Sequence, residues 1–131
     1  LLLAKRLGRD VRITIYGSPA PRIKKTEYVK KWEAIQRGIE EGSVAAGKIA
    51  LIEADRMLGE VLEKAGYEGK STGEKLSSVK AGQLEGAREA SKSHNICQRI
   101  MEDPTYSIDQ GALREALSGY EKVFRGLGVI D

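Results

Sequence analysis

Apolar residues recur at intervals of three and four through most of this 131-residue chain, which is the spacing of one face of an α-helix. The pattern begins at Thr26, and glycines and capping residues divide it into segments. It predicts helices at about 26–41, 44–65 and 83–101, a short helix opened by Ser71, and a fifth helix from Asp109 to Leu127. Period-two runs typical of strands are absent after Tyr16. We therefore predict an all-α fold, an antiparallel up-and-down bundle with four main helices plus one short helix, preceded by a basic extended N-terminal arm.

The ends of these segments carry recognisable helix signals. Ser43 and Asp109 are predicted N-caps, and Ser71-Thr72-Gly73-Glu74 has the form of a capping box, although Gly73 weakens a helix there. The predicted core faces are Tyr28, Trp32, Ile35 and Ile39; Leu51, Ala54, Leu58, Val61, Leu62 and Ala65; Leu76; Leu84, Ala87, Ala90, His94, Cys97 and Met101; and Leu113, Ala116, Leu117, Tyr120, Val123, Phe124 and Leu127.

Positive charge is concentrated at the start of the chain. Residues 1–25 carry seven bases and one acid, a net charge of +6, whereas the other 106 residues carry 15 bases and 18 acids, a net charge of −3. The bases are Lys5, Arg6, Arg9, Arg12, Arg22, Lys24 and Lys25. We expect residues 1–25 to form an arm and linker that contacts RNA, an anionic membrane surface or a neighbouring subunit, and residues 26–131 to form the bundle.

The arm contains two patterned segments. Residues 1–9 resemble the last turn of an apolar segment followed by basic residues, a pattern found on the cytoplasmic side of a membrane helix. The alternative is a frayed terminus or the middle of a soluble helix. Residues 11–16 alternate like a strand, which must pair with another copy or a partner, or stay loose. No apolar run approaches the roughly 18 residues that cross a bilayer. The expected location is the cytoplasm, with tethering to the cytoplasmic face of a membrane as the alternative.

The rare residue types exclude several kinds of site. A single cysteine, Cys97, excludes an intrachain disulfide, and a single histidine, His94, excludes a His-rich metal centre. No P-loop is present, and the glycines after Ala65 do not form a dinucleotide-binding fingerprint behind a strand. We therefore expect no metal and no small-molecule cofactor.

Three polar residues fall on the predicted core faces. They are Asp55, His94 and Tyr120, and a carboxylate on an apolar face must find a partner. The leading interpretation is a satisfied polar contact inside the bundle, and the alternative is a catalytic acid and base. No serine nucleophile elbow is recognisable, and Cys97 fits a small core residue better than a nucleophile.

The second half of the chain resembles a known family. The similarity is carried by residues 52–58 (IEADRML), 66–69 (GYEG), 99–106 (RIMEDPTY) and 112–122 (ALREALSGYEK). These stretches resemble small bacterial helical proteins that look like HEPN domains, and the resemblance covers about residues 27–128. It implies a helical bundle, often dimeric, and many such domains are RNases that use an Arg, four to six residues and then a His near a helix end.

The RNase motif is degenerate in this chain. Its positions correspond to Cys97, Gln98 and Glu102, so neither the Arg nor the His is present. The cation for a phosphate and the imidazole for proton transfer are both missing at these positions. A literal Arg-x5-His occurs from Arg88 to His94, but it is out of register, and the face assignment sends Arg88 to solvent. The resemblance thus supports the fold and argues against the activity.

Two classes of function follow. The first is a non-catalytic HEPN-like binding or assembly module that self-associates as a homo-oligomer, with no catalytic residues and a basic arm for its partner. The alternative is a divergent metal-independent RNase. The expected interface is an apolar strip on the fourth helix formed by Ile96 and Ile100, at i, i+4 spacing.

Overall fold

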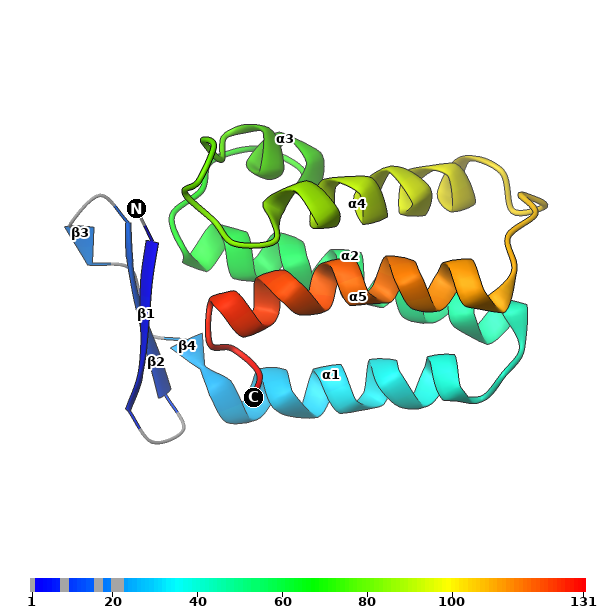
Figure 1. Ribbon diagram of the computed structural model, residues 1–131, viewed down its shortest axis with the longest axis horizontal. Coiled ribbons are helices and arrows are strands. Elements are labelled where there is room, and N and C mark those ends of the chain that lie inside the picture. Colours follow the sequence, from blue (N-terminus) through cyan, green and yellow to red (C-terminus); the bar gives the residue numbers. More distant parts are fainter. Residues whose placement is uncertain (1, 8–9, 16–17, 20–22) are drawn as a thin grey trace.

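The computed structural model describes the backbone of residues 2–7, 10–15, 18–19 and 23–131, and side chains from Lys25 onward. Its five helices are α1 (Lys25–Glu40), α2 (Val44–Lys64), α3 (Thr72–Ser77), α4 (Ala87–Glu102) and α5 (Gln110–Gly126). Figure 1 shows α1 running antiparallel to α2, and α4 running antiparallel to α5. The predicted all-α up-and-down bundle of four main helices and one short helix is confirmed.

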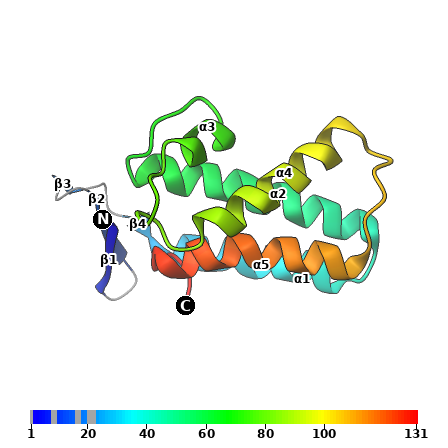
Figure 2. The same ribbon diagram turned by 45° about the horizontal axis from the view of Figure 1, so that its top comes forward.

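Helix α2 is the centre of the bundle. It packs against α1, α3, α4 and α5, and the two views show it behind the layer formed by α4 and α5 (Figures 1 and 2). Its 21 residues make it the longest of the five helices described. A polar side chain on its inner face is therefore surrounded by the other helices and must find its partner among them.

Most of the helix ends follow the capping signals in the sequence. The side-chain oxygens of Ser43, Ser71 and Asp109 accept hydrogen bonds from the backbone three residues later, at 3.1, 3.1 and 2.7 Å. Each bond satisfies one of the amides that a helix start leaves without an intrahelical partner. The capping box at Ser71 is modified, because Glu74 Oε1 accepts from the backbone N–H of Lys70 at 3.3 Å.

Helix α4 begins later than predicted. The backbone of Gly82 and Gly86 has φ angles of +76° and +83°, which right-handed helices do not accommodate. The segment between them forms turns, and Gln83 and Leu84 are buried there without belonging to a helix. Burial of Leu84 was correctly predicted, but the helix starts only at Ala87.

The core is formed by the apolar faces of the helices. All predicted inward residues of the first, second and fifth helices are buried, and the Trp32 and Phe124 rings meet edge to face at 5.4 Å between centroids. The chain after α5 adds Val129 and Ile130, which are 0% and 2% exposed.

The end of α4 differs from the prediction. Met101 is 60% exposed, although it was predicted to face the core, and Ile100 is 4% exposed, although it was predicted to form an exposed strip with Ile96. Ile96 is half-buried and packs on the core. Ile100 lies two turns beyond Ser93 on the same face of α4, and the Ser93 hydroxyl donates to the carbonyl of Ala116 in α5 at 2.6 Å. Ile100 therefore lies on the side of α4 that faces α5 and belongs to the buried face, so the strip prediction is wrong for Ile100.

Lys25 belongs to the bundle and not to the arm. It is 7% exposed and forms an ion pair with the side chain of Asp131, which ties the start of α1 to the end of the chain. The prediction that Lys25 binds a polyanion is therefore wrong, because its charge is buried and paired. The side chains of the other six predicted arm residues lie outside the described side chains.

The arm contains short strands. They are β1 (Leu2–Leu7), β2 (Asp10–Ile15), β3 (Ser18–Pro19) and β4 (Ile23–Lys24). β1 and β2 pair antiparallel, with Leu2 opposite Ile15 and Leu7 opposite Asp10. The predicted strand exists, and its partner is the preceding segment of the same chain. The prediction of helix over residues 1–9 is wrong for Leu2–Leu7, which form strand β1. In the described part of the chain, no helix combines the length and apolar character required to cross a bilayer.

The contact between α4 and α5 leads to a stability prediction. A Cβ atom added at Gly119 would lie 2.8 Å from the carbonyl oxygen of Glu89, and Ser93 closes the same space. Gly119→Ala should lower the free energy of unfolding by about 1–3 kcal/mol, because the two helices must separate to accept a methyl group. Urea-induced unfolding followed by circular dichroism measures this change.

Gly111→Ala in the same helix is the matched control. Its added Cβ would have only the Asp109 carboxylate nearby, at 3.4 Å, and Gly111 is exposed. Alanine there should leave stability unchanged or raise it by up to about 1 kcal/mol through helix propensity. Equal effects at the two positions would contradict the close helix contact at Gly119.

Candidate functional site

A buried polar cluster joins three helices around Asp55. One carboxylate oxygen of Asp55, Oδ1, lies 2.8 Å from His94 Nδ1 and 2.8 Å from the hydroxyl of Tyr120. Asp55 belongs to α2, His94 to α4 and Tyr120 to α5. The structure thus brings together the three polar residues that the sequence placed on core faces, and Asp55 accepts a hydrogen bond from each of the other two.

The cluster has a defined hydrogen-bond arrangement. Because the Asp55 carboxylate can only accept, His94 carries a proton on Nδ1 and Tyr120 donates its hydroxyl proton. The other ring nitrogen, His94 Nε2, lies 3.3 Å from the amide nitrogen of Gln98, one turn further along α4. The side chains of Asp55 and His94 are 13% and 11% exposed, so the pair is almost entirely out of water.

Burial and the Asp55 charge shift the pKa values of the cluster. The pKa of His94 is raised above its ordinary value, because the hydrogen bond to Asp55 outweighs the opposing effect of burial. The pKa of Tyr120 is raised, first by burial and then by the negative charge of Asp55, so its hydroxyl stays protonated. Burial, together with the same carboxylate, raises the pKa of the Cys97 thiol to about 12. Cys97 is therefore a protonated core thiol and a poor nucleophile.

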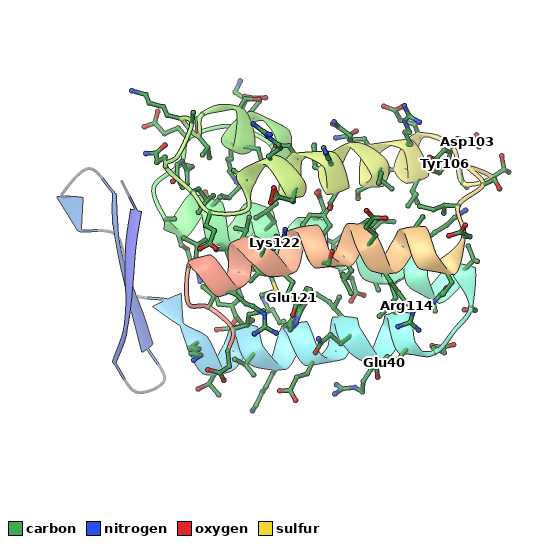
Figure 3. The ribbon with its side chains drawn as sticks, viewed as in Figure 1. Glu40, Asp103, Tyr106, Arg114, Glu121 and Lys122 are labelled. Atoms are coloured by element: carbon green, nitrogen blue, oxygen red, sulfur yellow. The ribbon has the colours of Figure 1, made fainter. Side chains whose placement is uncertain are left out.

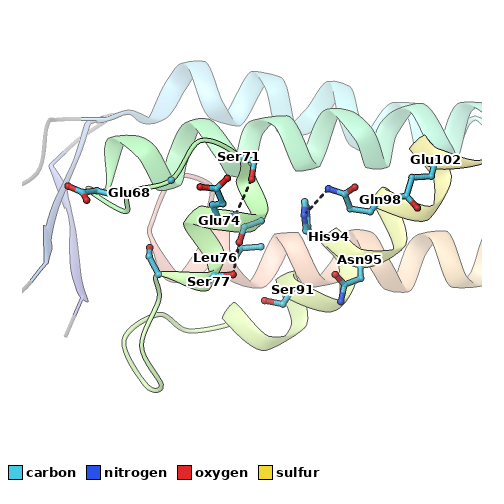
Figure 4. A pocket seen from close by; sticks show the side chains of 13 residues that line it. Glu68, Ser71, Glu74, Leu76, Ser77, Ser91, His94, Asn95, Gln98 and Glu102 are labelled. Carbon is cyan, nitrogen blue, oxygen red and sulfur yellow. Dashed lines mark hydrogen bonds between the residues drawn. The ribbon is translucent and has the colours of Figure 1, made fainter.

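His94 also lines a pocket at the surface of the bundle. The pocket has a volume of about 890 Å³ and lies between one face of α4 and the segment that contains the Gly66–Lys70 loop and α3 (Figure 4). Most of the residues that line it have polar side chains, and three of these are carboxylates, Glu68, Glu74 and Glu102. Ser91, Asn95 and Gln98 contribute from α4, and Ser71 and Ser77 from the opposite wall. No lysine or arginine is among the residues that line it.

A glycine allows α3 to approach His94. A Cβ atom added at Gly73 would lie 2.9 Å from His94 Nε2, which is closer than a side-chain carbon can approach without displacement. The short helix forms with Gly73 inside it, and the structure supplies a reason for a glycine at this position. Gly73 leaves room for the imidazole at the junction between the core cluster and the pocket.

The three positions that the HEPN resemblance assigns to an RNase motif have different environments. Cys97 is 1% exposed and lies inside the bundle, whereas Gln98 and Glu102 are exposed and line the pocket. The literal Arg-x5-His does not form a site, because Arg88 is exposed while His94 is buried against Asp55. The predicted directions of Arg88 and His94 are thus confirmed.

Sequence reasoning found the three core residues but missed two of their neighbours. Gln98 was considered only as a motif position, although its spacing of four from His94 on one helix places the two side chains on the same face. Gly73 was considered only as a weak helix residue. Its proximity to His94 depends on how α3 packs against α4, which no local pattern encodes.

Comparison with protein-family models, with curated proteins and with solved structures gave no match to this chain. Among the described side chains, no group of three or more His, Cys, Asp or Glu residues is arranged to hold a metal ion.

The cluster provides part of a catalytic arrangement. An imidazole held by a carboxylate through Nδ1, with Nε2 turned to a pocket, is how general bases are commonly oriented. The hydroxyls at the opposite wall take part in local helix bonds: Ser71 Oγ accepts from Glu74, and Ser77 Oγ donates to the carbonyl of Gly73 at 2.9 Å. A base is thus present, but the pocket lining contributes no lysine or arginine to stabilise a developing negative charge.

The raised pKa of His94 leads to a prediction about stability and pH. A histidine whose pKa is higher in the folded than in the unfolded chain stabilises the fold fully below the unfolded value of about 6.5. This contribution is lost as the pH rises through the folded pKa. It amounts to about 1.4 kcal/mol for each pKa unit by which the folded value exceeds the unfolded value. Urea unfolding of the wild type and His94→Gln from pH 5.5 to 8.5 measures it.

The expected result is a stability difference between the two proteins that is largest at the acidic end and decreases toward the alkaline end. Subtracting the variant removes the contributions of the other titrating groups, which are common to both proteins. A difference that grows with rising pH would show that burial, and not Asp55, dominates the pKa of His94.

Proposed function

We propose that this chain is a non-catalytic HEPN-like binding and assembly module, with a bundle that self-associates and a basic arm that contacts RNA. The observation that carries the proposal is the separation of its charges. The pocket beside the only histidine is lined by three carboxylates and by no lysine or arginine, while residues 1–24 carry six bases and one acid.

This charge distribution disfavours cleavage of RNA in the pocket. A phosphodiester brings negative charge, and its transition state brings more, so a pocket lined by Glu68, Glu74 and Glu102 repels it. The motif's Arg and His would bring positive charge and an imidazole to this place, but their two positions hold Cys97 and Glu102. Cys97 is a buried neutral thiol, and Glu102 adds a further negative charge.

The arm has the charge that a polyanion requires. Lys5, Arg6, Arg9 and Arg12 fall within eight positions, and Asp10 is the only acid of the arm. Binding to nucleic acid releases counterions from its phosphates, which makes affinity depend on the number of clustered bases and on salt. The same cluster of bases would also bind the anionic head groups of a membrane surface.

A charge-matched pair of full-length variants tests the arm. Replacing Lys5, Arg6, Arg9 and Arg12 by glutamine should weaken binding to a fluorescent single-stranded RNA by about tenfold or more at low salt, and should flatten the dependence of affinity on salt. Fluorescence anisotropy measures the affinity, and electrophoresis of the same RNA should show no cleavage.

The control replaces Lys30, Arg37, Arg99 and Arg114 by glutamine. These four side chains are exposed, and Figure 3 shows Arg114 on α5, near the end of the bundle where that helix begins. This variant loses the same four charges and should bind nearly as well as the wild type. Equal loss in both variants would refute the arm as the binding element, and binding to anionic vesicles but not to RNA would assign the arm to a membrane surface.

One observation favours the alternative of a divergent RNase. The Asp55–His94 pair has the geometry of an oriented base at the edge of a pocket. If RNA incubated with the wild type were cleaved without a metal ion, and cleavage were lost in His94→Ala, the chain would be an enzyme and the binding proposal would be wrong.

Self-association of the bundle calls for an apolar contact surface. With Ile100 inside the core, the exposed large apolar side chains of the described bundle include Ile49 near the start of α2 and Met101 near the end of α4, which are 58% and 60% exposed. Figure 1 shows that these two parts of the helices lie at the same end of the bundle. We propose this end as the contact with a second copy.

Light scattering tests this contact. The wild type should have a mass of at least twice the 14.3 kDa of one chain, and the double variant Ile49→Lys, Met101→Lys should approach the mass of one chain with unchanged helicity. Ile100→Asp is the contrasting variant, because a charge in the core should reduce helicity itself. A wild-type mass of one chain, or no change in the double variant, would reject the contact.

A further inference from the structure

We propose that the side-chain amide of Gln98 reverses its orientation when His94 gains a proton, so that one wall of the pocket changes from a hydrogen-bond acceptor to a donor. The two residues lie one turn apart on α4, and Gln98 is exposed to the pocket while His94 is buried beside it. Both side chains belong to one helix of one chain, so this change needs neither the arm nor a second copy.

The first step is the state seen in the structure. Asp55 holds the Nδ1 proton of His94, so the neutral ring has an unprotonated Nε2 that can only accept. The Gln98 amide nitrogen, not its oxygen, lies 3.3 Å from that atom. Gln98 thus donates one N–H to His94, and its carbonyl oxygen is left for the pocket.

The second step is protonation of the imidazole. The ring then carries a proton on Nε2 as well, and an N–H of Gln98 facing this proton would be repelled. Rotation of the amide by half a turn presents its oxygen to Nε2 and directs its NH₂ group into the pocket. Both states of His94 are then satisfied, which a side chain with only donors or only acceptors could not achieve.

The groups around His94 favour this change. Asp55 from α2 and Tyr120 from α5 hold the ring from the core side, and Gly73 of α3 lies against Nε2 without a side chain that could replace Gln98. The Cys97 thiol faces the same carboxylate and remains neutral, because burial raises its pKa to about 12.

The charged groups of the pocket act in the same direction. The carboxylates that line it are Glu68 in the loop, Glu74 on α3 and Glu102 on α4. Glu102 is one turn beyond Gln98 on the same helix, so a reversed amide turns its N–H groups toward negative charge. The raised pKa of His94 places the change at a higher pH than for an ordinary histidine.

Nuclear magnetic resonance of the full-length, ¹⁵N-labelled protein tests the proposal from pH 5.5 to 8.5. The His94 ring nitrogens should titrate with a midpoint above about 6.5. Contacts between the Gln98 amide protons and the His94 ring protons, measured as nuclear Overhauser effects, should be present above the midpoint and absent below it. The Gln98 amide signals should shift with the same midpoint.

Asn95 supplies the internal control. It lies on the same wall of the pocket, its side chain has no hydrogen bond to His94 among those described, and its amide should not follow the titration. In His94→Gln, the Gln98 signals should lose their dependence on pH. In Gln98→Glu, which can only accept, the midpoint of His94 should rise by about one unit.

Three results would overturn the proposal. The Gln98 contacts could persist unchanged through the His94 titration, Gln98 and Asn95 could respond equally, or His94 could fail to titrate in the folded protein. The first would show a fixed amide, the second a general effect of charge, and the third an imidazole locked in one state.

Discussion

The bundle depends on the partners of one buried carboxylate. Asp55 stands on the inner face of α2, the helix that contacts all the others, and a charge there is costly unless it is hydrogen-bonded. Its side chain accepts from His94 and Tyr120, and its backbone carbonyl accepts from the hydroxyl of Thr72 at 3.4 Å. This one residue therefore fixes the positions of α3, α4 and α5 along α2, where apolar contacts alone would tolerate small shifts of one helix along another.

Local sequence signals predict most of the helices, but they do not predict which residues near the end of α4 are buried. The core faces of α1, α2 and α5 follow from the helical repeat because these helices are covered along their length. On α4, the repeat was centred on His94 and predicted Met101 inside and Ile100 outside. In the structure the buried face of α4 includes Ser93 and Ile100, on the side that contacts α5, while Met101 near the helix end is exposed. Which side of α4 is covered depends on the packing of the neighbouring helices, which a single-helix pattern does not contain.

The candidate site was predictable in part for the same reason. Polar residues on apolar faces are conspicuous, so Asp55, His94 and Tyr120 could be found without a structure. That they meet at a single carboxylate oxygen depends on the positions of three helices along one another. The pocket combines α4 with a loop and a six-residue helix, whose placement depends on Gly73 and on the bond from Thr72 to α2.

Cys97 lies in the core, at the position where the HEPN resemblance would place an arginine. Cys97 lies close enough to Asp55 for the carboxylate to raise its pKa, and it is 1% exposed. An arginine at this position would bring a guanidinium to the same carboxylate and would compete with His94 for its oxygen atoms. A neutral thiol leaves the Asp55 carboxylate to the imidazole of His94 and the phenol of Tyr120. A neutral residue at position 97 is thus what makes the cluster of Asp55, His94 and Tyr120 compatible with a closed core.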